Sequence, residues 1–402
     1  MSSRVNWLVN WYHKVPRQKL AMIWAMGYRQ SMDHFDVAII GAGIAGASLA
    51  GRIAGKRKTI LLEMEERPAY HTTGRSASAY EPNYGTPAML ALTRAGGDFF
   101  KSPPQGFTEA PLFTPRGSLF FEAEGQEAHT ARLLRESAGL SEINEAEARQ
   151  IFPILREGYA QRIFRDHGTG DLDVDLIHRG FMKMFKAGGG TVALSSPVQA
   201  LERKGNAWVV TLPGRKISAT TVVNAAGAWG DIVGQMAGAK ALDLVPKRRS
   251  IAVVPPPDGM ASDGWPMVTD VGETWYSKPQ SGKLLVSSAD ATPVEPHDAY
   301  ADDMAIAEGI ERMMNATTIE VERVEHTWGG LRSFVSDKVA VAGYDPKQEG
   351  FFWLVGQGGY GIQTSPALSE TAAALLLGEA IPQRILDFGL DPKALSPQRF
   401  SA

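Results

Sequence analysis

Apolar positions near the start of the chain predict a strand, a turn, a helix and a second strand. The first strand is expected at 36–40, where Val-Ala-Ile-Ile follows an aspartate, and the second at 59–62, which reads Thr-Ile-Leu-Leu. Apolar runs of this length are typical of strands buried on both faces of a parallel sheet. The helix between them begins near residue 44 and consists almost entirely of apolar and small residues. This order of elements predicts a βαβ unit.

Later apolar runs predict that the chain leaves this unit and returns to it. Further strands are expected at 117–121, 194–210, 221–224, 253–257, 273–279, 283–288, 338–344 and 351–355. The charged run at 124–150 predicts a helix, and another helix is expected at 365–377 after a glycine-rich turn. Proline and glycine separate the strands between 253 and 288, which is typical of antiparallel pairing.

We therefore predict an α/β fold. A Rossmann-like dinucleotide-binding domain is interleaved with a substrate-binding domain built on a mostly antiparallel sheet. The first domain is assigned to 35–98, 190–245 and 325–402, and the second to 99–189 and 246–324.

Residues 1–34 are predicted to be an N-terminal extension outside this fold. Its apolar patches, 7–12 and 19–26, are too short to span a bilayer. Three interpretations stay open: a segment that lies on a membrane surface, a helix docked on the protein itself, or an upstream start with Met32 as the natural beginning.

The turn after the first strand carries glycines in the spacing of a dinucleotide site. Gly41 allows a tight turn, Gly43 lets backbone approach a pyrophosphate, and Gly46 lets the helix pack closely on the strand. The N–H groups that begin the helix can then bind the phosphate. Glu63 ends the second strand at the distance expected of an acid that accepts from a ribose hydroxyl. An acid at this position favours FAD or NAD over NADP.

Composition narrows the chemistry without identifying it. The 402-residue chain is 44% hydrophobic and 21% charged, as in an ordinary globular protein, and we expect it in the cytoplasm. A net charge of -3 gives no basic surface for nucleic acid. The chain has no cysteine, which excludes disulfides and catalytic thiols, and none of its eight histidines occurs in a metal-binding spacing. We therefore expect no metal and a reaction that depends on an organic cofactor.

Five motifs follow one another in an order that resembles one family of flavoproteins. They are the GxGxxG turn, Gly-Arg-Ser-Ala at 74–77, Asn-Ala-Ala-Gly-Ala-Trp at 224–229, His-Thr-Trp-Gly-Gly-Leu-Arg at 326–332 and Gly-Gln-Gly-Gly-Tyr-Gly-Ile-Gln at 356–363. Together they resemble the D-amino-acid oxidase superfamily of FAD-dependent oxidoreductases. Within it the sequence is most similar to the D-arginine dehydrogenase group, with a further match in Pro-Lys-Arg-Arg-Ser at 246–250.

The resemblance implies FAD that is bound non-covalently, and it implies the residues that bind it. These are Gly41, Gly43, Ile44, Ala45, Gly46, Glu63, Gly74, Arg75, Ser76, Ala77, Val198, Ala226, Gly227, Trp229, Gly330, Gly358, Gly361, Ile362 and Gln363. Ser76 and Ala77 are expected along the isoalloxazine ring. His71 is expected to be a packing residue of the same loop.

The resemblance also implies oxidation of a D-amino acid, with the Cα hydrogen moving as hydride to flavin N5. Arginine is suited to the substrate carboxylate because its planar fork binds both oxygens. Arg332 and Arg249 fall on the family's substrate positions. Tyr84 and Tyr276 are expected to donate hydrogen bonds to the same carboxylate or to close the site. No side chain is required as a general base.

The resemblance implies other substrate contacts. This sequence also differs from the family at positions that determine substrate specificity. Gly359 and Gln363 are expected to contact the substrate amine and the flavin. Where the arginine-preferring enzymes carry an acid that meets the substrate guanidinium, this chain has Ser118, and a family histidine and threonine appear as Ala79 and Glu81. Glu81 either restores the missing negative charge or points away, in which case apolar or small D-amino acids are the expected substrates.

Alternative functions stay open at this point. The same cofactor domain serves enzymes that oxidise secondary amines such as sarcosine, and a non-catalytic flavin-binding protein is a further alternative. We choose a dehydrogenase over an oxidase on the resemblance alone, with an unidentified electron acceptor such as a quinone.

Overall fold

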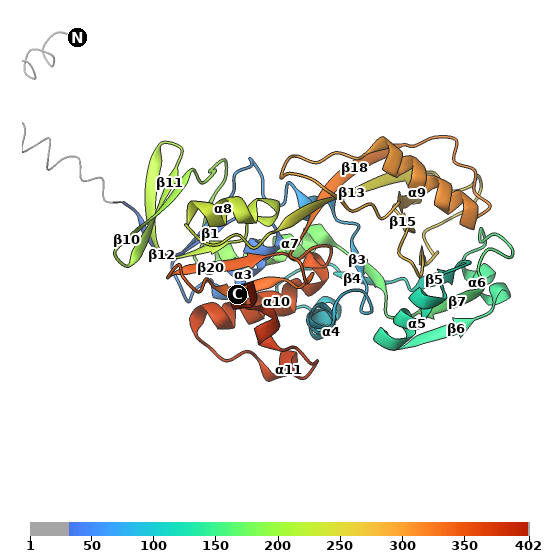
Figure 1. Cartoon of the computed structure of the whole chain (residues 1–402), viewed down its shortest axis with the longest axis horizontal. Helices are drawn as coiled ribbons and strands as arrows, with labels where there is room; N and C mark the ends of the chain where they lie inside the picture. The colour runs from blue at the N-terminus through green and yellow to red at the C-terminus, as the bar shows by residue number, and fades with distance from the viewer. Residues whose placement is uncertain (1–31, 401–402) are drawn as a thin grey trace, which may run out of the picture.

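The structure is a computed structural model that describes residues 32–400, and its two large sheets lie at opposite ends of the molecule (Figure 1). The apolar patches of the predicted N-terminal extension lie outside these residues. Within 32–400, no helix is both long enough and apolar enough to cross a membrane. Helices and strands alternate along the chain, which confirms the α/β fold class.

The first sheet is built around the predicted βαβ unit. Its strands are β1 (His34–Ile40), β2 (Thr59–Leu62), β9 (Thr191–Ala193), β10 (Ala200–Lys204), β11 (Ala207–Leu212), β12 (Arg215–Asn224), β19 (Val341–Tyr344) and β20 (Phe351–Val355). β1 pairs in parallel with β2 on one side and with β12 on the other. The long β12 pairs with β11 over its first half and with β20 over its second half. The chain thus returns to this sheet after long excursions, as predicted.

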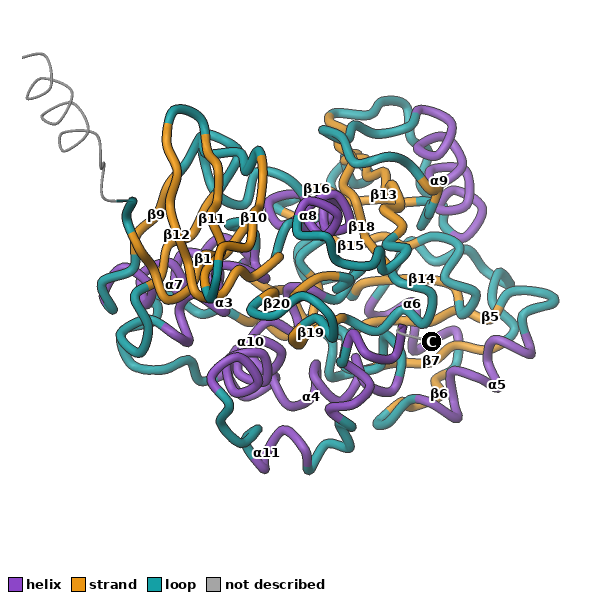
Figure 2. The backbone as a smooth tube through the Cα atoms, turned by 60° about the vertical axis from the view of Figure 1, so that its left-hand side comes forward, coloured by secondary structure: helices purple, strands orange, loops and turns teal. Residues whose placement is uncertain are grey.

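Helices cover this sheet, most of them on one face (Figure 2). The helical segments are α3 (Ile44–Ile53), η1 (Thr72–Arg75), α4 (Pro87–Lys101), α7 (Val174–Ala187), η2 (Gly227–Trp229), α8 (Gly230–Met236), α10 (Gly361–Leu377), α11 (Gln383–Leu386), η3 (Pro392–Leu395) and η4 (Pro397–Phe400). α3 lies between α7 and α10 and is almost completely buried. A Cβ atom at Gly51 would lie 2.9 Å from the backbone oxygen of Phe181. Glycine there lets α3 and α7 approach closely.

The second sheet is mostly antiparallel, also as predicted. Its strands are β5 (Ser118–Glu122), β6 (Leu140–Ile143), β7 (Arg162–Asp166), β13 (Val245–Val254), β14 (Met267–Asp270), β15 (Tyr276–Gln280), β16 (Lys283–Ser287), β17 (Thr292–Pro293) and β18 (His326–Phe334). Only the β5–β14 pair among these strands is parallel. Three helices accompany the sheet: α5 (Glu127–Glu136), α6 (Glu145–Ile151) and α9 (Asp303–Ala316).

The pairing of β13 with β18 brings the two candidate arginines together. Gly330 lies opposite Arg249, and Lys247 lies opposite Arg332. Residues directly opposite each other share a face of an antiparallel pair, and so do residues two apart on one strand. Arg249 and Arg332 are therefore diagonal neighbours on one face, with a glycine leaving space beside them.

A small sheet of β3 (Ala79–Tyr80), β8 (Gly170–Leu172) and β4 (Phe113–Pro115) joins the two large ones. Asp171 on β8 accepts a hydrogen bond of 2.6 Å from the ammonium of Lys278 and one of 2.6 Å from Nε of Arg116. Lys278 is only 3% exposed, and burial lowers its pKa while Asp171 opposes that shift. Since Lys278 lies two residues after Tyr276, this cluster ties the small sheet to the strand that carries a candidate substrate residue.

Lys278→Met is expected to lower the free energy of unfolding by about 3 kcal/mol, near the lower end of the range for breaking a buried pair, because Asp171 keeps Arg116 as a partner. Urea unfolding measures the effect. The control is Lys283→Met, since Lys283 pairs with Glu325 at the surface. Equal losses for the two variants would contradict the buried pair's role.

The helix predicted at 124–150 is wrong, because two helices and a strand occupy this span. α5 ends at Glu136, and Gly139 has a left-handed φ of +75°, which turns the chain into β6. α6 then starts afresh at a capping box in which Asn144 and Glu147 satisfy each other's backbone N–H groups. The charged composition indicated a helix, but composition alone does not show that Gly139 ends one helix and that Asn144 begins another.

The predicted division into two domains stays a prediction, and the sheets depart from it at two places. β18 was assigned to the cofactor domain but pairs with β13 in the second sheet. α7 was assigned to the substrate domain but packs on α3 under the first sheet. In both cases the contacting element, β13 for β18 and α3 for α7, is remote in sequence.

Candidate active site

A pocket opens where β1, β2 and β12 end. Its walls include Gly41 after β1, Glu63 after β2 and Ala225 after β12, together with the start of α3, η1, η2 and the start of α10. Ligands of parallel α/β sheets bind at this carboxyl edge. The same pocket continues to Arg249 on β13 and Arg332 on β18, so it spans both sheets.

The glycines of the first turn are required by close contacts. Gly41 has a φ of +103°, and a Cβ atom there would lie 2.4 Å from the backbone oxygen of Ala225. A Cβ atom at Gly46 would lie 1.9 Å from the backbone oxygen of Gly41. Gly43 caps α3 in an extended conformation and lines the pocket. The N–H groups of the first helical turn have no partner within the helix, so they can receive an anion.

Glu63 is fixed where a ribose acceptor is expected. It is 7% exposed, and its carboxylate accepts hydrogen bonds from the backbone N–H groups of Ala42 at 2.8 Å and Glu65 at 3.0 Å. A carboxylate has acceptor sites beyond these two, and the residue lines the pocket. Together with the glycine turn and the small residues along the far wall, this arrangement fits the adenosine and pyrophosphate of FAD.

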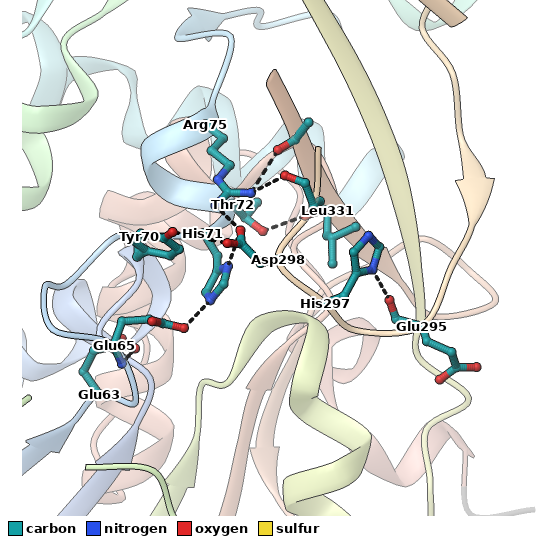
Figure 3. Close-up of polar contacts among 12 residues, drawn as sticks. Glu63, Glu65, Tyr70, His71, Thr72, Arg75, Glu295, His297, Asp298 and Leu331 are labelled. Atoms are coloured by element: carbon teal, nitrogen blue, oxygen red, sulfur yellow. Dashed lines mark hydrogen bonds and ion pairs between the residues drawn. The ribbon is translucent and has the colours of Figure 1, made fainter. Parts of the chain in front are cut away.

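The wall beside Glu63 is a polar and aromatic cluster (Figure 3). Nε2 of His71 lies 2.8 Å from a carboxylate oxygen of Glu65, and the His71 ring lies 4.7 Å from that of Trp229. Both rings line the pocket. The contacts agree with the packing role expected of His71.

Asp298 ties this wall to a segment from the second sheet (Figure 3). It forms an ion pair with Arg75 and accepts a hydrogen bond of 3.2 Å from the hydroxyl of Tyr70. The hydrogen bond from Arg75 lowers the pKa of Asp298. Arg75 also donates to the backbone oxygen of Gly329 at 3.2 Å. The segment around Asp298 therefore holds residues 70–75 against β18.

Asp298→Asn is expected to speed release of FAD by about 2- to 5-fold, the range for an ion pair exposed to solvent. The change weakens the contact with Arg75 without altering any residue that lines the pocket. FAD fluorescence after dilution of the holoprotein gives the release rate. Asp258→Asn is the control, because Asp258 is exposed and remote from the pocket wall. The same release rate in both variants would refute this role.

Arg332 presents a guanidinium that has no hydrogen-bonding partner among the residues the structure describes. A Cβ atom at Gly359 would lie 3.0 Å from Nη1 of Arg332, so the glycine makes room for the side chain. Within residues 32–400 it forms no hydrogen bond or ion pair. Burial acts to lower the pKa of Arg332, but Tyr276, Tyr84 and Glu81 oppose it and leave the pKa above its ordinary value. The group is therefore positively charged and free to bind an anion.

Arg249 is oriented by a neighbouring loop. Its Nε donates to the backbone oxygen of Asp290 at 2.8 Å, and its guanidinium lies 5.9 Å from the ring centre of Tyr276. Burial and the nearby Arg332 lower the pKa of Arg249, while Tyr276 opposes the shift. Two like charges held this close favour a bound anion between them.

Further donors near Arg332 also lack acceptors. The hydroxyl of Tyr276 and Nε2 of Gln363 are buried without a hydrogen-bond partner in the described part of the chain. Tyr84 lies 5.0 Å from Tyr360 between ring centres, and burial raises the pKa of both hydroxyls. Both tyrosines therefore stay protonated and able to donate. Unsatisfied buried donors cost free energy, so the unpaired Tyr276 hydroxyl and Gln363 amide indicate a ligand that offers acceptor atoms.

Most of the predicted cofactor residues line the pocket. They are Gly41, Gly43, Ile44, Ala45, Glu63, Arg75, Ser76, Ala77, Val198, Ala226, Gly227, Trp229, Gly330, Gly358, Gly361 and Ile362. Gly46, Gly74 and Gln363 are outside this lining. Gly46 and Gly74 instead allow two stretches of backbone to approach closely. A Cβ atom at Gly74, for example, would lie 2.5 Å from the backbone oxygen of Ala69.

The predicted substrate residues divide into two groups. Arg249, Arg332 and Gly359 line the pocket. Tyr84, Tyr276, Ala79, Glu81 and Ser118 are outside its lining. Ala79 packs against a buried cluster that includes Tyr276. Ser118 is 1% exposed and its hydroxyl lies 3.0 Å from that of Thr169. Its side chain is therefore engaged within the protein, and its role toward substrate stays a prediction.

Several residues near the site escaped the sequence analysis. Thr73 accepts a hydrogen bond of 2.9 Å from the backbone N–H of Ile44, and Asp290 orients Arg249. Tyr360 packs on Tyr84, and Glu273 acts electrostatically on both tyrosines. Of these residues, only Thr73 could have been found from the sequence, because its hydroxyl directly precedes the motif at 74–77. Within residues 32–400, no group of acidic residues and histidines is arranged to hold a metal ion.

Comparisons with known proteins agree with this geometry. The model of the DAO family, described as FAD dependent oxidoreductase, matches residues 36–375. Glycine oxidase of Bacillus subtilis (strain 168) is 24% identical over 384 residues, which cover 90% of this chain and 98% of that protein. FAD-dependent oxidoreductase domain-containing protein 1 of Xenopus laevis is 21% identical, with coverage of 86% and 79%. The crystal structure of L-proline dehydrogenase from P. horikoshii has a TM-score of 0.78 at 18% identity, with coverage of 92% and 98%.

Proposed function

Because the chain belongs to the DAO family of FAD-dependent oxidoreductases, we propose that it oxidises D-amino acids to imino acids, which water hydrolyses to 2-oxo acids and ammonia. The family also establishes FAD as the cofactor. We propose the D-amino acid substrate, its stereochemistry and the dehydrogenase activity. We propose the similarity to the D-arginine dehydrogenase group in the same way.

The proposal rests on the guanidinium of Arg332, which is unpaired within residues 32–400 and lies in the pocket lined by the cofactor motifs. A carboxylate is the natural partner of an unpaired guanidinium, because two parallel N–H···O bonds form at once. Arg249 lies on the same sheet face, and Tyr276 offers a buried hydroxyl without an acceptor. The site is thus suited to a substrate with a carboxylate next to its reacting carbon.

The protein's share of the chemistry is binding and orientation. When bound, FAD supplies the acceptor for the hydride that leaves Cα. Arg332 and Arg249 hold the substrate carboxylate, and the hydroxyls of Tyr276 and Tyr84 add hydrogen bonds to it. Fixing the carboxylate orients Cα in part, and selection of one enantiomer also requires defined places for the amine and the side chain. The amine must be neutral when the hydride leaves.

The direct test is anaerobic mixing of the purified yellow protein with paired D- and L-amino acids, with the loss of flavin absorbance as the readout. Reduction by D-enantiomers alone supports the proposal. Reduction by glycine or sarcosine alone would favour an enzyme of small or secondary amines, in line with the glycine oxidase relative. No reduction by any compound would indicate a non-catalytic flavoprotein. Reoxidation of the reduced protein by oxygen or by a soluble quinone then separates oxidase from dehydrogenase.

A further inference from the structure

The second sheet is interrupted on one side of Arg249. β13 pairs with β18 along nearly its whole length, but on its other side it pairs with β16 only from Ala252 onward and with β17 only up to Arg248. Residues 249–251 therefore have no strand beside them on that side. The loop 288–291 connects β16 with β17 across this gap. The backbone groups that face the gap need other partners, because buried backbone groups are almost always hydrogen-bonded.

Two side chains take the place of the missing strand. The backbone N–H of Ser250 donates to the carboxylate of Asp290 at 2.6 Å, and the backbone oxygen of Ser250 accepts from the hydroxyl of Ser287 at 2.7 Å. The hydroxyl of Ser250 donates to the second carboxylate oxygen of Asp290 at 3.0 Å. Ser250 is fully buried, and the side chain of Asp290 is 9% exposed. The Asp290 carboxylate is thus fixed to the sheet by two hydrogen bonds, which are stronger than neutral ones because the acceptor is charged.

The gap places Asp290 against Arg249. The backbone oxygen of Asp290 accepts from Nε of Arg249 at 2.8 Å, and one of its carboxylate oxygens lies 3.9 Å from the same nitrogen. Among the described residues, the two terminal nitrogens of Arg249 form no hydrogen bond, and the residue lines the pocket. The contact therefore fixes the direction of the guanidinium and leaves its outer edge for a ligand.

The loop adopts an unfavourable backbone conformation to make this contact. Ala289, directly before Asp290, has a left-handed φ of +54°, which is uncommon for a residue with a side chain. Its N–H donates to the hydroxyl of Ser287 at 3.2 Å. The hydroxyl of Ser250 also accepts from the backbone N–H of Asp302 at 3.0 Å, so a second loop supports the same point. Such conformations persist where the surrounding structure enforces them, and they cluster at binding sites.

We propose that Asp290 is a positioning residue for the substrate carboxylate and acts through Arg249. Its carboxylate, fastened to Ser250, fixes the loop whose backbone oxygen directs the guanidinium. The inference rests on the proposed function, in which Arg249 and Arg332 hold the carboxylate. A side chain that is ordered before the substrate arrives loses little conformational freedom on binding. Asp290 therefore contributes to affinity although it lies outside the pocket lining.

The test is a double-mutant cycle of Asp290→Ala and Arg249→Ala, with KM and kcat for the preferred D-amino acid taken from anaerobic flavin reduction. Asp290→Ala alone is expected to raise KM by about 3- to 10-fold, the range for a side chain that must be ordered on binding, and to leave kcat within about 2-fold. In a protein that already carries Arg249→Ala, the same change should leave KM unchanged, because the positioned arginine is gone. An equal increase in both backgrounds would overturn the inference, since the carboxylate would then support only the fold.

Three further variants make the cycle specific. Asp290→Asn keeps an acceptor for the N–H of Ser250 and should restore KM to within about 2-fold of the wild type, whereas a KM as high as that of Asp290→Ala would contradict a positioning role. Ser250→Ala removes one of the two bonds to the carboxylate and serves in the same cycle if Asp290→Ala does not fold. It should raise KM by about 3-fold only where Arg249 is present. Asp258→Ala is the control, because Asp258 is exposed in the loop after β13, and it should change neither KM nor kcat.

Binding of propanoate, a carboxylate without an amine, gives a readout that needs no turnover. The absorbance of the oxidised flavin follows the titration, and Asp290→Ala should bind propanoate about 3- to 10-fold more weakly than the wild type. This pattern without flavin reduction by any D-amino acid would overturn the proposed function and support the positioning role for another carboxylate ligand. Reduction by D-amino acids with KM and propanoate affinity independent of Asp290 would overturn the positioning role alone.

Discussion

Arg332→Ala is expected to lower kcat/KM for the preferred D-amino acid by about 30- to 5000-fold, which corresponds to about 2–5 kcal/mol of lost binding to a desolvated charge. The guanidinium has no other partner among the described residues, so its removal costs the protein little stability and takes the binding energy from the substrate. The remaining Arg249 is tied to Asp290 and cannot take over the position. Stopped-flow flavin reduction over a range of substrate concentrations measures the loss.

Two variants make that result specific. Arg332→Lys keeps the charge but offers a single point of contact, and we expect it to recover only part of the activity. Arg323→Ala removes an exposed arginine that pairs with Glu325, and it should leave kcat/KM unchanged. An efficiency of Arg332→Ala within about 2-fold of the wild type would remove Arg332 from the substrate site.

Gly46→Ala is expected to abolish FAD binding and to destabilise the fold. Its Cβ atom would lie 1.9 Å from the backbone oxygen of Gly41, far inside van der Waals contact, and backbone cannot move aside as a flexible side chain can. Relief requires α3 to move away from β1, which shifts the N–H groups that face the pyrophosphate. We expect colourless protein on purification and a loss of about 1–3 kcal/mol in the free energy of unfolding, as for overpacking in a dense core.

The control for this substitution is Gly264→Ala, because Gly264 has open space around it and an ordinary φ. It should retain full FAD content. The FAD-to-protein ratio and urea unfolding of the two variants give the comparison. Full FAD content in Gly46→Ala would mean that the first turn tolerates a wider separation than the structure indicates.

Local sequence predicted the glycine turn and the acid after the second strand, because the requirements of this turn are local. The glycines from 41 to 46 and the acid at 63 belong to one βαβ unit, and each has a steric or electrostatic reason that can be stated without coordinates. The antiparallel strands between 253 and 288 could also be predicted from the sequence, since proline and glycine mark their turns. The single helix expected at 124–150 failed, because composition does not reveal a left-handed glycine or a capping box inside a charged run.

The rest of the site depends on contacts between distant segments. Nothing in the sequence near Arg249 indicates that Asp290 holds it, and nothing near Glu81 indicates Glu273 as a neighbour. The same limit applies to β18, which the predicted domain division places in the cofactor domain although it pairs with β13, a strand that precedes it by a long excursion. The contact of Ser118 with Thr169, 51 residues further along the chain, is likewise not indicated by any motif.

The pocket that joins the two sheets has a consequence for how the protein reaches its active form. Its lining runs from Ile40 to Ile362, so the site is complete only after segments from most of the chain have met. Loops of that length close slowly. Proteins in which most contacts join residues remote in sequence therefore fold slowly and pass through partly formed states. Flavin capture therefore reports the last assembly step, and during refolding the yellow colour should return after the helical signal.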